Sequence, residues 1–434
     1  MVDVDVDVVV VGAGPAGAAA ALALGRAGRS VLLVERGPFP GSKNVYGGVV
    51  YPRVLGDVLP AWWERAPIQR FVTRRATMVL TETQAVTVDV RTEAWGAPPY
   101  NGVTAYRSEF DQWLADEAVR AGATLATSTT VTGLVRDGDR VVGVMTDRPD
   151  GELGCRLVVA CDGVNAFLAR EAGLYPGYSS HHLTLGVKEV LRLERAELEA
   201  RFNLVGREGC DIEMIGATGS ITGGGFLYTN LETLAVGCVL KLDELAAQAR
   251  RPEAVLTELK AHPAIAPLVA GTELVEYAAH LLPEGGYDAM PELGAPGIVV
   301  AGDAASMTLA AGVWLEGVNY AMAAGRLAGQ AAALARAEPG GIAGAYVHYR
   351  RLLEGSFVMQ DHKRLRRAPK VVFSEFVQRV QPGVLCDVAE SFFTVDNPSP
   401  KRGLIATVRG VLRARGVRWR DALRSALATA RLFR

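Results

Sequence analysis

The sequence has few cysteines and no closely spaced cysteine pair. None of its five cysteines forms a CxxC motif, so a zinc ion or an iron–sulfur cluster would lack its usual ligands. An odd number of widely separated cysteines also argues against a disulfide-built scaffold. We therefore predict no metal site in this chain. The five residues are Cys155, Cys161, Cys210, Cys238 and Cys386.

The sequence also lacks an excess of charge of either sign. Its 46 Lys and Arg face 47 Asp and Glu, giving a net charge of -1, so the chain as a whole does not have the basic character of a nucleic-acid-binding protein. The N-terminus, MVDVDVD, is acidic and lacks the basic start of a signal peptide. The uncharged run from Val8 to Gly25 has the length of a membrane span, but its glycines and its proline favour a soluble fold. We expect a cytoplasmic protein whose membrane contact is peripheral.

What the sequence does contain is a strand–turn–helix–strand unit at its start. Val8 to Val11 is a β-branched run typical of a strand buried on both faces, and GAGPAG follows directly. The residues up to Gly25 favour helix, and Val31 to Val34 predict a second buried strand that leads to Glu35. This βαβ pattern carries a dinucleotide-binding fingerprint at its first turn. The alternative is a glycine-rich turn in an ordinary βαβ unit.

Each glycine of the fingerprint has a physical role. Gly12 permits the tight turn, Gly14 lets a pyrophosphate approach the backbone, and Gly17 lets helix and strand pack closely. The helix N-terminus then offers free N–H groups and a positive dipole end to the phosphates. Glu35 lies 23 positions after Gly12, where its carboxylate can accept hydrogen bonds from an adenosine ribose.

The segment that follows is a second candidate for cofactor contact. Arg36 to Pro52 is rich in glycine and proline, which is typical of a loop, and it starts next to the nucleotide. Lys43, Asn44, Gly47 and Gly48 offer polar or backbone groups to a cofactor. The alternative is a plain surface loop.

Two later strands are predicted to end in an acid beside a glycine. Leu157 to Asp162 is a buried run followed by Gly163, and Pro296 to Ala305 repeats the plan with Gly302 and Asp303. Such an acid can bind a ribose or ribityl hydroxyl. Helix-forming sequence then continues to residue 334, and a helix start near residue 317 would aim its amides at a cofactor ring. Taken singly, each of these dipeptides is more often a simple turn.

Local patterns predict further elements between these motifs. The expected elements are β-like alternation over 76–90, a helix over 108–121 capped by Ser108 with Arg107 just before it, and strands 124–135 and 140–146 joined by Asp137-Gly138.

Residues 183–279 differ in character and predict an inserted domain. Strands of an antiparallel sheet are expected at 186–192, 213–221, 225–229 and 233–240, with a helix over 252–260. Gly223, Gly224 and Gly225 allow close backbone approach, and Phe226 and Tyr228 offer aromatic surface. The alternative is a bulged strand with core aromatics.

The histidines that precede this domain are tempting catalytic candidates. His181 and His182 are adjacent, and adjacent residues of a strand point to opposite faces. We therefore expect both to be structural.

With these motifs placed, the sequence resembles FixC-type flavoproteins of the electron transfer flavoprotein:quinone oxidoreductase family over nearly its full length. The motifs that carry the resemblance are GAGPAG, KNVYGG, YRSEFDQWL, CDGVN, GVKEV, GGGFLYTN, HPAIAPLVAG, LVEYAAH and VVAGDAA. The KNxxGG loop and GGGFLYTN are much more specific than the first and last motifs. The resemblance implies FAD, the fold of the hydroxybenzoate-hydroxylase group, and electron transfer with a two-subunit electron transfer flavoprotein.

The expected fold class is α/β: a Rossmann-like FAD-binding domain of the hydroxybenzoate-hydroxylase and glutathione-reductase type, an inserted antiparallel-sheet domain and a helical C-terminal region. The expected boundaries are 1–85, 103–178 and 290–335 for the FAD domain, 86–102 and 179–289 for the quinone-side domain, and 336–434 for the C-terminal region with its basic amphipathic tail.

The motifs and the resemblance together predict the cofactor-binding positions, with Gly47 and Gly48 near the flavin ring. These positions are Gly12, Gly14, Pro15, Ala16, Gly17, Glu35, Arg36, Lys43, Asn44, Gly47, Gly48, Arg107, Val131, Asp162, Gly163, Gly302, Asp303, Gly312, Gly317, Val318 and Asn319. On the quinone side we expect Gly224, Gly225, Phe226 and Tyr228. No protein side chain is expected to act as the catalyst, because the flavin carries the redox chemistry.

Two positions depart from the family pattern. Tyr46 stands where the family's loop often has Thr, and Glu316 stands where many relatives have Arg. An acid near the flavin disfavours its anionic reduced form, as any like charge does. We therefore expect a flavin potential that differs from that of relatives.

The function implied by the resemblance is an FAD-dependent oxidoreductase. It would pass electrons from an electron transfer flavoprotein to quinone, to a ferredoxin-like subunit or to both, within a Fix-type complex, such as those linked to nitrogen fixation, for which electron bifurcation stays open. One alternative is an FAD monooxygenase or a geranylgeranyl-reductase-like enzyme on the same fold, although no second complete GxGxxG is present for a nicotinamide cofactor. Another is a subunit that uses its flavin structurally and docks on a membrane.

The C-terminal tail suggests further partners. Residues 401–434 hold ten Lys or Arg and one acid, and Trp419, Leu423, Leu427 and Ala430 recur at helical spacing, so we expect contact with an anionic membrane surface. A basic helix packed on the chain's own core is the alternative. Because Cys386 is the only cysteine after Cys238, no iron–sulfur cluster is expected in this chain. A separate ferredoxin-like subunit, steered by this tail and the basic residues 363–367, would supply it.

Overall fold

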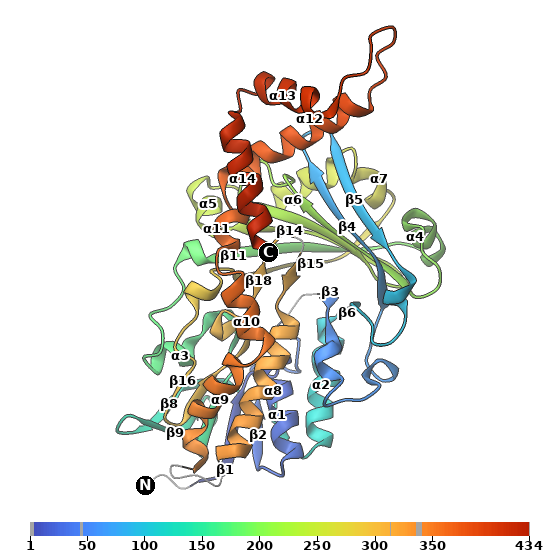
Figure 1. The fold of residues 1–434 in the computed structure, drawn as a ribbon. Coiled ribbons are helices and arrows are strands. Elements are labelled where there is room, and N and C mark those ends of the chain that lie inside the picture. The colour runs from blue at the N-terminus through green and yellow to red at the C-terminus, as the bar shows by residue number, and fades with distance from the viewer. Residues whose placement is uncertain (1–3, 44–46, 313, 336–340, 434) are drawn as a thin grey trace.

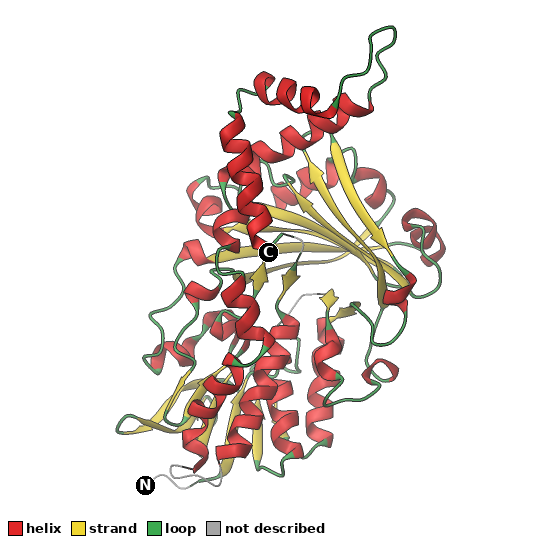
Figure 2. Ribbon diagram, viewed as in Figure 1, coloured by secondary structure: helices red, strands yellow, loops and turns green. Residues whose placement is uncertain are grey.

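The computed structural model describes residues 4–43, 47–312, 314–335 and 341–433. Its strands form two large sheets at different levels of an elongated molecule, and the C-terminal helices run along one side and over the far end (Figure 1). Figure 2 shows the helices packed beside the lower sheet and around the upper one. Among the described residues, no helix has the length and apolar character needed to cross a bilayer.

The first sheet has eight strands and contains the predicted βαβ unit. Strands β7, β2, β1, β10 and β17 are parallel neighbours in that order, while β16 pairs antiparallel at the edge and the β8–β9 hairpin extends β10. The strands are β1 (Val6–Val11), β2 (Val31–Val34), β7 (Thr124–Ala126), β8 (Val131–Asp137), β9 (Arg140–Thr146), β10 (Glu152–Ala160), β16 (Gly294–Ala295) and β17 (Ile298–Val300). Residues 8–11 of β1, residues 157–160 of β10 and all of β17 are buried on both faces, so these stretches are continuous apolar runs.

Helices α1 (Pro15–Arg26) and α8 (Val318–Leu334) pack against each other beside this sheet. Their backbones approach closely because small residues face each other. A Cβ added at Gly325 would lie 1.9 Å from the carbonyl oxygen of Ala16, and one at Gly329 would lie 2.8 Å from that of Ala20. Helix α2 (Arg107–Arg120) packs on the other flank of α1.

The second sheet has nine strands and forms the inserted domain. Its order is β15–β11–β14–β13–β12–β4–β6–β3, with β5 paired to β4, and every pairing is antiparallel except that of β4 with β12. The strands are β3 (Gly47–Val50), β4 (Arg70–Leu80), β5 (Ala85–Arg91), β6 (Val103–Tyr106), β11 (Leu183–Arg192), β12 (Glu208–Ile215), β13 (Gly223–Thr229), β14 (Thr233–Lys241) and β15 (Glu273–Pro283).

The two faces of this sheet differ in chemistry. Cys210, Ile212 and Met214 alternate along β12 and belong to an apolar core that also contains Leu256 and Leu259 of α6 (Pro252–Ala261). The intervening residues of β12 are acids, and they project from the opposite face. The remaining helices of this region are α4 (Arg195–Phe202), α5 (Leu242–Ala247) and α7 (Ala266–Val269).

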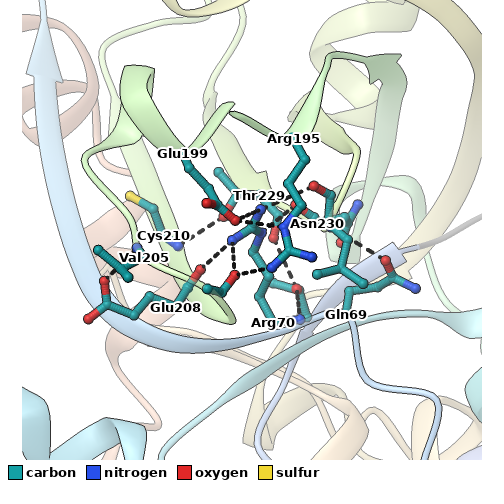
Figure 3. A network of polar contacts seen from close by, with 12 residues as sticks. Gln69, Arg70, Arg195, Glu199, Val205, Glu208, Cys210, Thr229 and Asn230 are labelled. Carbon is teal, nitrogen blue, oxygen red and sulfur yellow. Dashed lines mark hydrogen bonds and ion pairs between the residues drawn. The ribbon is translucent and has the colours of Figure 1, made fainter. Parts of the chain in front are cut away.

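A buried arginine ties together the edge of the second sheet where β4 begins. The side chain of Arg70 is fully buried and donates to the carbonyl oxygens of Asn230 at 2.5 Å and Glu208 at 2.9 Å (Figure 3). It also pairs with the carboxylate of Glu199 in α4 at 3.4 Å. Burial lowers the pKa of Arg70, and Glu199 opposes that shift. These bonds fix β4, β12 and the β13–β14 turn against one another.

The C-terminal region is helical, as expected. Helices α9 and α10 continue from α8, α11 follows, and α12 and α13 form the far end of the molecule before α14 returns toward the second sheet (Figure 1). The bounds are α9 (Ala345–Glu354), α10 (Phe357–Arg364), α11 (Ala368–Val372), α12 (Gln381–Phe393), α13 (Leu404–Ala414) and α14 (Trp419–Leu432), and the short α3 (Phe167–Glu171) belongs to the first domain.

The pairing of β3, β4 and β6 differs from the expected domain boundaries. These strands lie within 1–85 and 103–178, the segments assigned from sequence to the FAD domain, yet they belong to the second sheet. Their partners are distant in sequence, so no local pattern revealed the pairing. The hairpin of 124–146 also differs, because the predicted strand 124–135 is two strands: β7 pairs with β2, and only β8 forms the hairpin with β9.

The close contact between α1 and α8 gives a stability prediction. Gly325→Ala should lower the free energy of unfolding by about 1–3 kcal/mol, because the new methyl group overlaps the Ala16 carbonyl oxygen. Gly410→Ala in α13 is the matched control: its Cβ would meet no atom within 4 Å, and Ala exceeds Gly in a helix by about 0.5–1 kcal/mol. Denaturant unfolding measures both, and equal stabilisation of the two variants would contradict the contact.

Candidate cofactor site

The fingerprint turn has the geometry that its glycines predict. Gly12 has φ +95°, and a Cβ there would lie 2.3 Å from the carbonyl oxygen of Cys161. A Cβ at Gly17 would lie 1.8 Å from the Gly12 carbonyl oxygen. A Cβ added at Gly14 would meet only Nη2 of Arg107, at 4.0 Å. The turn is therefore tightly packed at Gly12 and Gly17 but open at Gly14, next to the N-terminus of α1, as a phosphate site requires.

Glu35 is directed back at this turn. Its Oε2 accepts a hydrogen bond from the amide of Ala13 at 3.0 Å, and its Oε1 accepts one from Gly37 at 2.7 Å. The residue is buried. A carboxylate has further lone pairs after two such bonds, so Glu35 can hold the turn and still accept from a ribose hydroxyl.

Arg107 places a positive charge beside the open side of the turn. Its guanidinium forms two hydrogen bonds to the carboxylate of Asp111, at 2.7 and 2.8 Å, and Asp111 is fully buried. The helix α2 begins at Arg107 itself, after Tyr106, so the expected cap at Ser108 is wrong. Starting there puts Arg107 and Asp111 four residues apart on one helix face, which holds the guanidinium in place.

Asp162 follows β10 and has an unused acceptor. Its Oδ2 accepts from the amide of Leu168 at 3.0 Å, while its Oδ1 is buried with no hydrogen-bond partner among the described residues. Burial raises the pKa of Asp162. Gly163 has φ +75° and lets the chain turn away directly. A buried carboxyl oxygen without a partner fits a ligand hydroxyl.

Asp303 lies in the turn that follows β17, and a residue missed from the sequence faces it. Burial raises the pKa of Asp303, which the nearby His280 and Arg107 oppose. His280 projects from β15 of the second sheet, and burial lowers its pKa, although Asp303 opposes this shift. His280 ends the LVEYAAH motif of the resemblance, but that motif assigned no role to the histidine and did not reveal its partner.

The N-terminus of α8 forms the other end of the site. Gly317 is its N-cap, with no side-chain capping bond, and Gly312 turns the preceding loop with φ +84°. Asn319 donates to Oε2 of Glu316 at 2.5 Å, and its own Oδ1 is buried without a hydrogen-bond partner among the described residues. Burial raises the pKa of Glu316. The first turn of α8, which includes Val318, thus offers free amides.

The remaining predicted cofactor positions that the structure describes lie in the segments around these ends of the site. Gly47 and Gly48 lie in β3, which pairs with β6 immediately before Arg107. Lys43 is exposed, and Asn44 and Tyr46 lie outside the described residues. Val131 begins β8, just after Thr129, whose amide donates to the Glu35 carbonyl oxygen at 3.0 Å. The other positions are Pro15 and Ala16, which begin α1, Arg36, which follows Glu35, and Gly302, with φ +72°.

The glycine-rich strand β13 splits the predicted quinone-side residues between two faces. The rings of Phe226 and Tyr228 stack with their centroids 5.9 Å apart, on the face that carries the acids of β12. Gly224 lies on the same face, because it is two residues before Phe226 on the strand. Gly225 is on the other face, where a Cβ would lie 3.0 Å from Cδ2 of Leu259. Gly225 therefore makes room for α6 and does not share a face with Phe226 and Tyr228.

The paired histidines are also arranged differently from the expectation. His181 and His182 lie in a helical turn over Ser180–His182, and their ring centroids are 4.0 Å apart. Both rings are within hydrogen-bond distance of Ser179. They do not point to opposite faces, because the strand begins only at Leu183.

A cavity of about 460 Å³ opens between the polar face of the second sheet and the start of α8. Sheet residue Arg75 lines it together with Tyr51, Glu316 and Asn319. Trp314 and Phe357 supply aromatic wall. The cavity therefore adjoins the α8 end of the site, where residues from both domains meet. Its other lining residues are Arg53, Val54 and Asn101.

Comparisons with known proteins agree with this geometry. Residues 5–220 match the family model described as "FAD binding domain". The structure is similar to a geranylgeranyl bacteriochlorophyll reductase-like protein from Thermoplasma acidophilum, with a TM-score of 0.71 and 18% identity over 94% of this chain and 95% of that one. The flavin-dependent halogenase CmlS has a TM-score of 0.63 and 19% identity, covering 94% and 76%. At such identities the likeness concerns the fold alone. It is the hydroxylase-type FAD fold, and together with the family model and the fingerprint it defines an FAD-binding flavoprotein.

Curated relatives then give the family. Protein FixC of Bradyrhizobium diazoefficiens is 37% identical over 95% of both chains. FixC of Azotobacter vinelandii is 39% identical over 87% of this chain and 88% of that one. A probable electron transfer flavoprotein-quinone oxidoreductase, YdiS, of Escherichia coli K12 is 36% identical over 86% and 87%. The chain belongs to this family of FixC proteins and electron transfer flavoprotein-quinone oxidoreductases.

The position of Glu35 gives a cofactor-binding prediction. Glu35→Ala should raise the dissociation constant for FAD about 10- to 150-fold, because hydrogen bonds to a charged acceptor contribute roughly 1.5–3 kcal/mol. Glu35→Gln keeps one carbonyl acceptor, so its dissociation constant for FAD should lie between those of the wild type and Glu35→Ala. Flavin fluorescence titration of the apoprotein measures this, with Glu152→Ala, an exposed acid in the same domain, as control. An unchanged constant in Glu35→Ala would contradict the assignment.

Proposed function

We propose that this chain holds one FAD without a covalent bond and passes electrons from an electron transfer flavoprotein to a quinone. The observation that carries the proposal is the similarity to a quinone oxidoreductase and to FixC proteins over nearly the whole of both chains. Similarity of the fold alone would not support this function, because the same fold serves other reactions.

The proposed FAD position follows from the ends of two helices. The pyrophosphate would lie over Gly14 at the N-terminus of α1, between the turn and Arg107. The free acceptors of Asp162 and Asn319 and the carboxyl group of Asp303 would bind hydroxyl and ring groups. When bound, FAD supplies the two-electron and one-electron chemistry. The chain's residues position it and exclude water.

The cavity is the proposed place where the acceptor meets the flavin. It joins the α8 end of the FAD position to the polar face of the second sheet, and Phe226 and Tyr228 lie on that same face. Aromatic surface supports binding of a flat ring such as a quinone headgroup.

We also propose a separate ferredoxin-like partner, because the sparse cysteines of this chain supply no clustered ligands for an iron–sulfur cluster. The basic residues 363–367 are weaker candidates for its docking than the sequence indicates. Lys363 pairs with Glu354, and Arg366 pairs with Asp288 at 2.5 Å, so part of this charge is already neutralised. The arginines of α13 and α14 are the better candidates. Complementary charge there would mainly raise the association rate.

The same C-terminal helices support the proposal of peripheral membrane contact. Trp419, Leu423 and Leu427 are 46–53% exposed and recur every four residues along α14. Ile405 of α13 is 67% exposed and Phe393 at the end of α12 is 82% exposed. Helices α12 and α13, which lead into α14, lie at the far end of the molecule (Figure 1), and the sequence from residue 401 on is rich in Lys and Arg. Exposed apolar side chains together with basic residues favour an anionic bilayer surface.

The other end of α14 is packed on the protein. Leu432 is buried, and Phe433 meets Trp314 of the cavity wall with ring centroids 5.4 Å apart. Arg415 anchors the preceding turn through two bonds to Asp387, at 2.6 and 2.9 Å. The tail is thus partly docked, as the alternative expected, and partly exposed.

The electron donor is tested by anaerobic spectroscopy. Reduced electron transfer flavoprotein should bleach the bound FAD, and addition of a short-chain quinone should restore its absorbance. NADH and NADPH should leave the spectrum unchanged. Bleaching by NADPH, with none by the electron transfer flavoprotein, would favour a monooxygenase or reductase of the same fold over this function.

Membrane contact is tested by substitution, because deleting the tail would also remove the packed residues Leu432 and Phe433. Changing Trp419, Leu423 and Leu427 to Ser should lower binding to anionic phospholipid vesicles at least tenfold, since a buried apolar side chain contributes roughly 1.5–3 kcal/mol. Binding by the wild type should weaken as salt rises. The matched control changes Val88, Val205 and Leu274, which lie elsewhere and are somewhat more exposed, to Ser. An equal loss in the control, or no loss in either variant, would refute the surface.

A further inference from the structure

A cluster of buried charged side chains lies behind the wall of the cavity. Arg75 of β4 contacts two acids of β12: its Nε is 3.2 Å from Oδ2 of Asp211, and its Nη2 is 2.9 Å from Oε1 of Glu213. Asp211 is 5% exposed and Glu213 is 6% exposed. The two acids are two positions apart on one central strand, so the backbone itself holds them on the same face, side by side.

The cluster has more acid than base. One guanidinium faces two carboxyl groups, so with both acids ionised the cluster would carry a buried net negative charge, which is costly. The groups that face it from other elements leave this excess in place: Tyr51 places its neutral ring with its centroid 5.4 Å from Cζ of Arg75, and Glu316 is a further acid on the cavity wall. Holding one proton makes the Arg75–Asp211–Glu213 cluster neutral.

The pKa shifts of the acidic groups agree with one retained proton in the cluster. Burial raises the pKa of Glu213 well above its usual value, and the charge of Asp211 adds to the rise. Burial also raises the pKa of Asp211, against the effect of Arg75. Burial, followed by Asp211, raises the pKa of Tyr51 well above its usual value, and burial raises that of Glu316. These shifts favour the neutral forms of the four acidic groups, whereas burial lowers the pKa of Arg75 less than the neighbouring acidic groups raise it, so Arg75 stays charged.

The cluster is one side chain away from the cavity. Arg75 and Tyr51 line the cavity, while the two acids lie behind Arg75 on β12. Tyr51 and the cavity lie on the polar face of the sheet, beside the acid pair, and the apolar core lies on the opposite face. A proton released by the pair therefore leaves toward Tyr51 and the cavity.

We propose that Asp211 and Glu213 share one exchangeable proton at neutral pH and deliver it, past Tyr51, to the electron acceptor bound in the cavity. The inference rests on the proposed function, which supplies a quinone as acceptor. Reduction of a quinone takes two electrons and two protons. The electrons come from the reduced electron transfer flavoprotein. For each proton, an O–H bond on the acid pair breaks and an O–H bond on a quinone oxygen forms, and water then reprotonates the pair.

The stored proton is tested first by infrared spectroscopy of the oxidised holoprotein, without turnover. At neutral pH the wild type should show protonated carboxyl absorption that shifts in heavy water, and the difference spectrum between wild type and Glu213→Gln should show loss of one component of it. Glu208→Gln, on the same strand but paired with Arg91 at the surface, should keep it. A band of undiminished intensity in both Glu213→Gln and Asp211→Asn would overturn the proposal.

Stability supplies a second readout. Because the folded pKa of Glu213 is raised, the native state keeps a proton that the unfolded state loses above its usual pKa of 4.5. Wild-type stability should therefore fall as pH rises from about that value toward the folded pKa. Glu213→Gln resembles the protonated acid and should lose this part of the fall. An identical pH dependence of stability in the wild type and Glu213→Gln would contradict a stored proton on Glu213.

Delivery is tested with two acceptors. Glu213→Gln should reduce quinone about 100-fold more slowly, as expected for loss of a proton donor, with KM unchanged. Its rate with ferricenium, which accepts an electron and no proton, should equal that of the wild type. Glu213→Asp keeps an acid and should recover part of the quinone rate. Equal losses with both acceptors would assign Glu213 a structural role and overturn the delivery step. If wild-type protein receives no electrons from electron transfer flavoprotein, the proposed function fails, while the infrared result still judges the stored proton.

Discussion

The structure depends on the close approach of α1 to α8. Gly325 and Gly329 let the backbone of α8 pack on Ala16 and Ala20 of α1, and Gly17 lets α1 pack on its own turn. As a result, both helices begin at the same edge of the parallel sheet. Ligands of such sheets bind at the carboxyl ends of the strands, and Asp162 and Asp303 emerge there from β10 and β17. One packing constraint thus brings two positive helix ends and two acids to a single elongated site.

The second sheet completes this site through its unequal faces. Its apolar face is covered by α6 and stabilises the domain, while its polar face closes the cavity. Arg70 supports this arrangement from the edge, because its guanidinium satisfies carbonyl groups that would otherwise be buried unpaired (Figure 3). The face that meets the cofactor domain is therefore rigid and charged, which suits control of protons better than simple burial of an apolar ligand.

The sequence predicted what depends on local pattern. The run from β1 to Glu35, the acids after β10 and β17, and the alternation of β11, β13 and β14 all follow from short-range periodicity and turn chemistry. It did not predict contacts between distant segments. Arg75 and Asp211 are 136 residues apart, and only the parallel pairing of β4 with β12 joins them. The same holds for His280 beside Asp303, and for Gly225, whose face depends on where α6 packs.

The account's central claim is that α1 and α8 present one FAD to the polar face of the second sheet. The most direct measurement is a crystal structure of the chain with FAD bound. We predict the pyrophosphate within hydrogen-bond distance of the amides that follow Gly14, and the flavin ring beside the amides of residues 317–319, with one face toward the cavity lined by Arg75. A flavin ring bound away from α8, or separated from that cavity, would contradict the account.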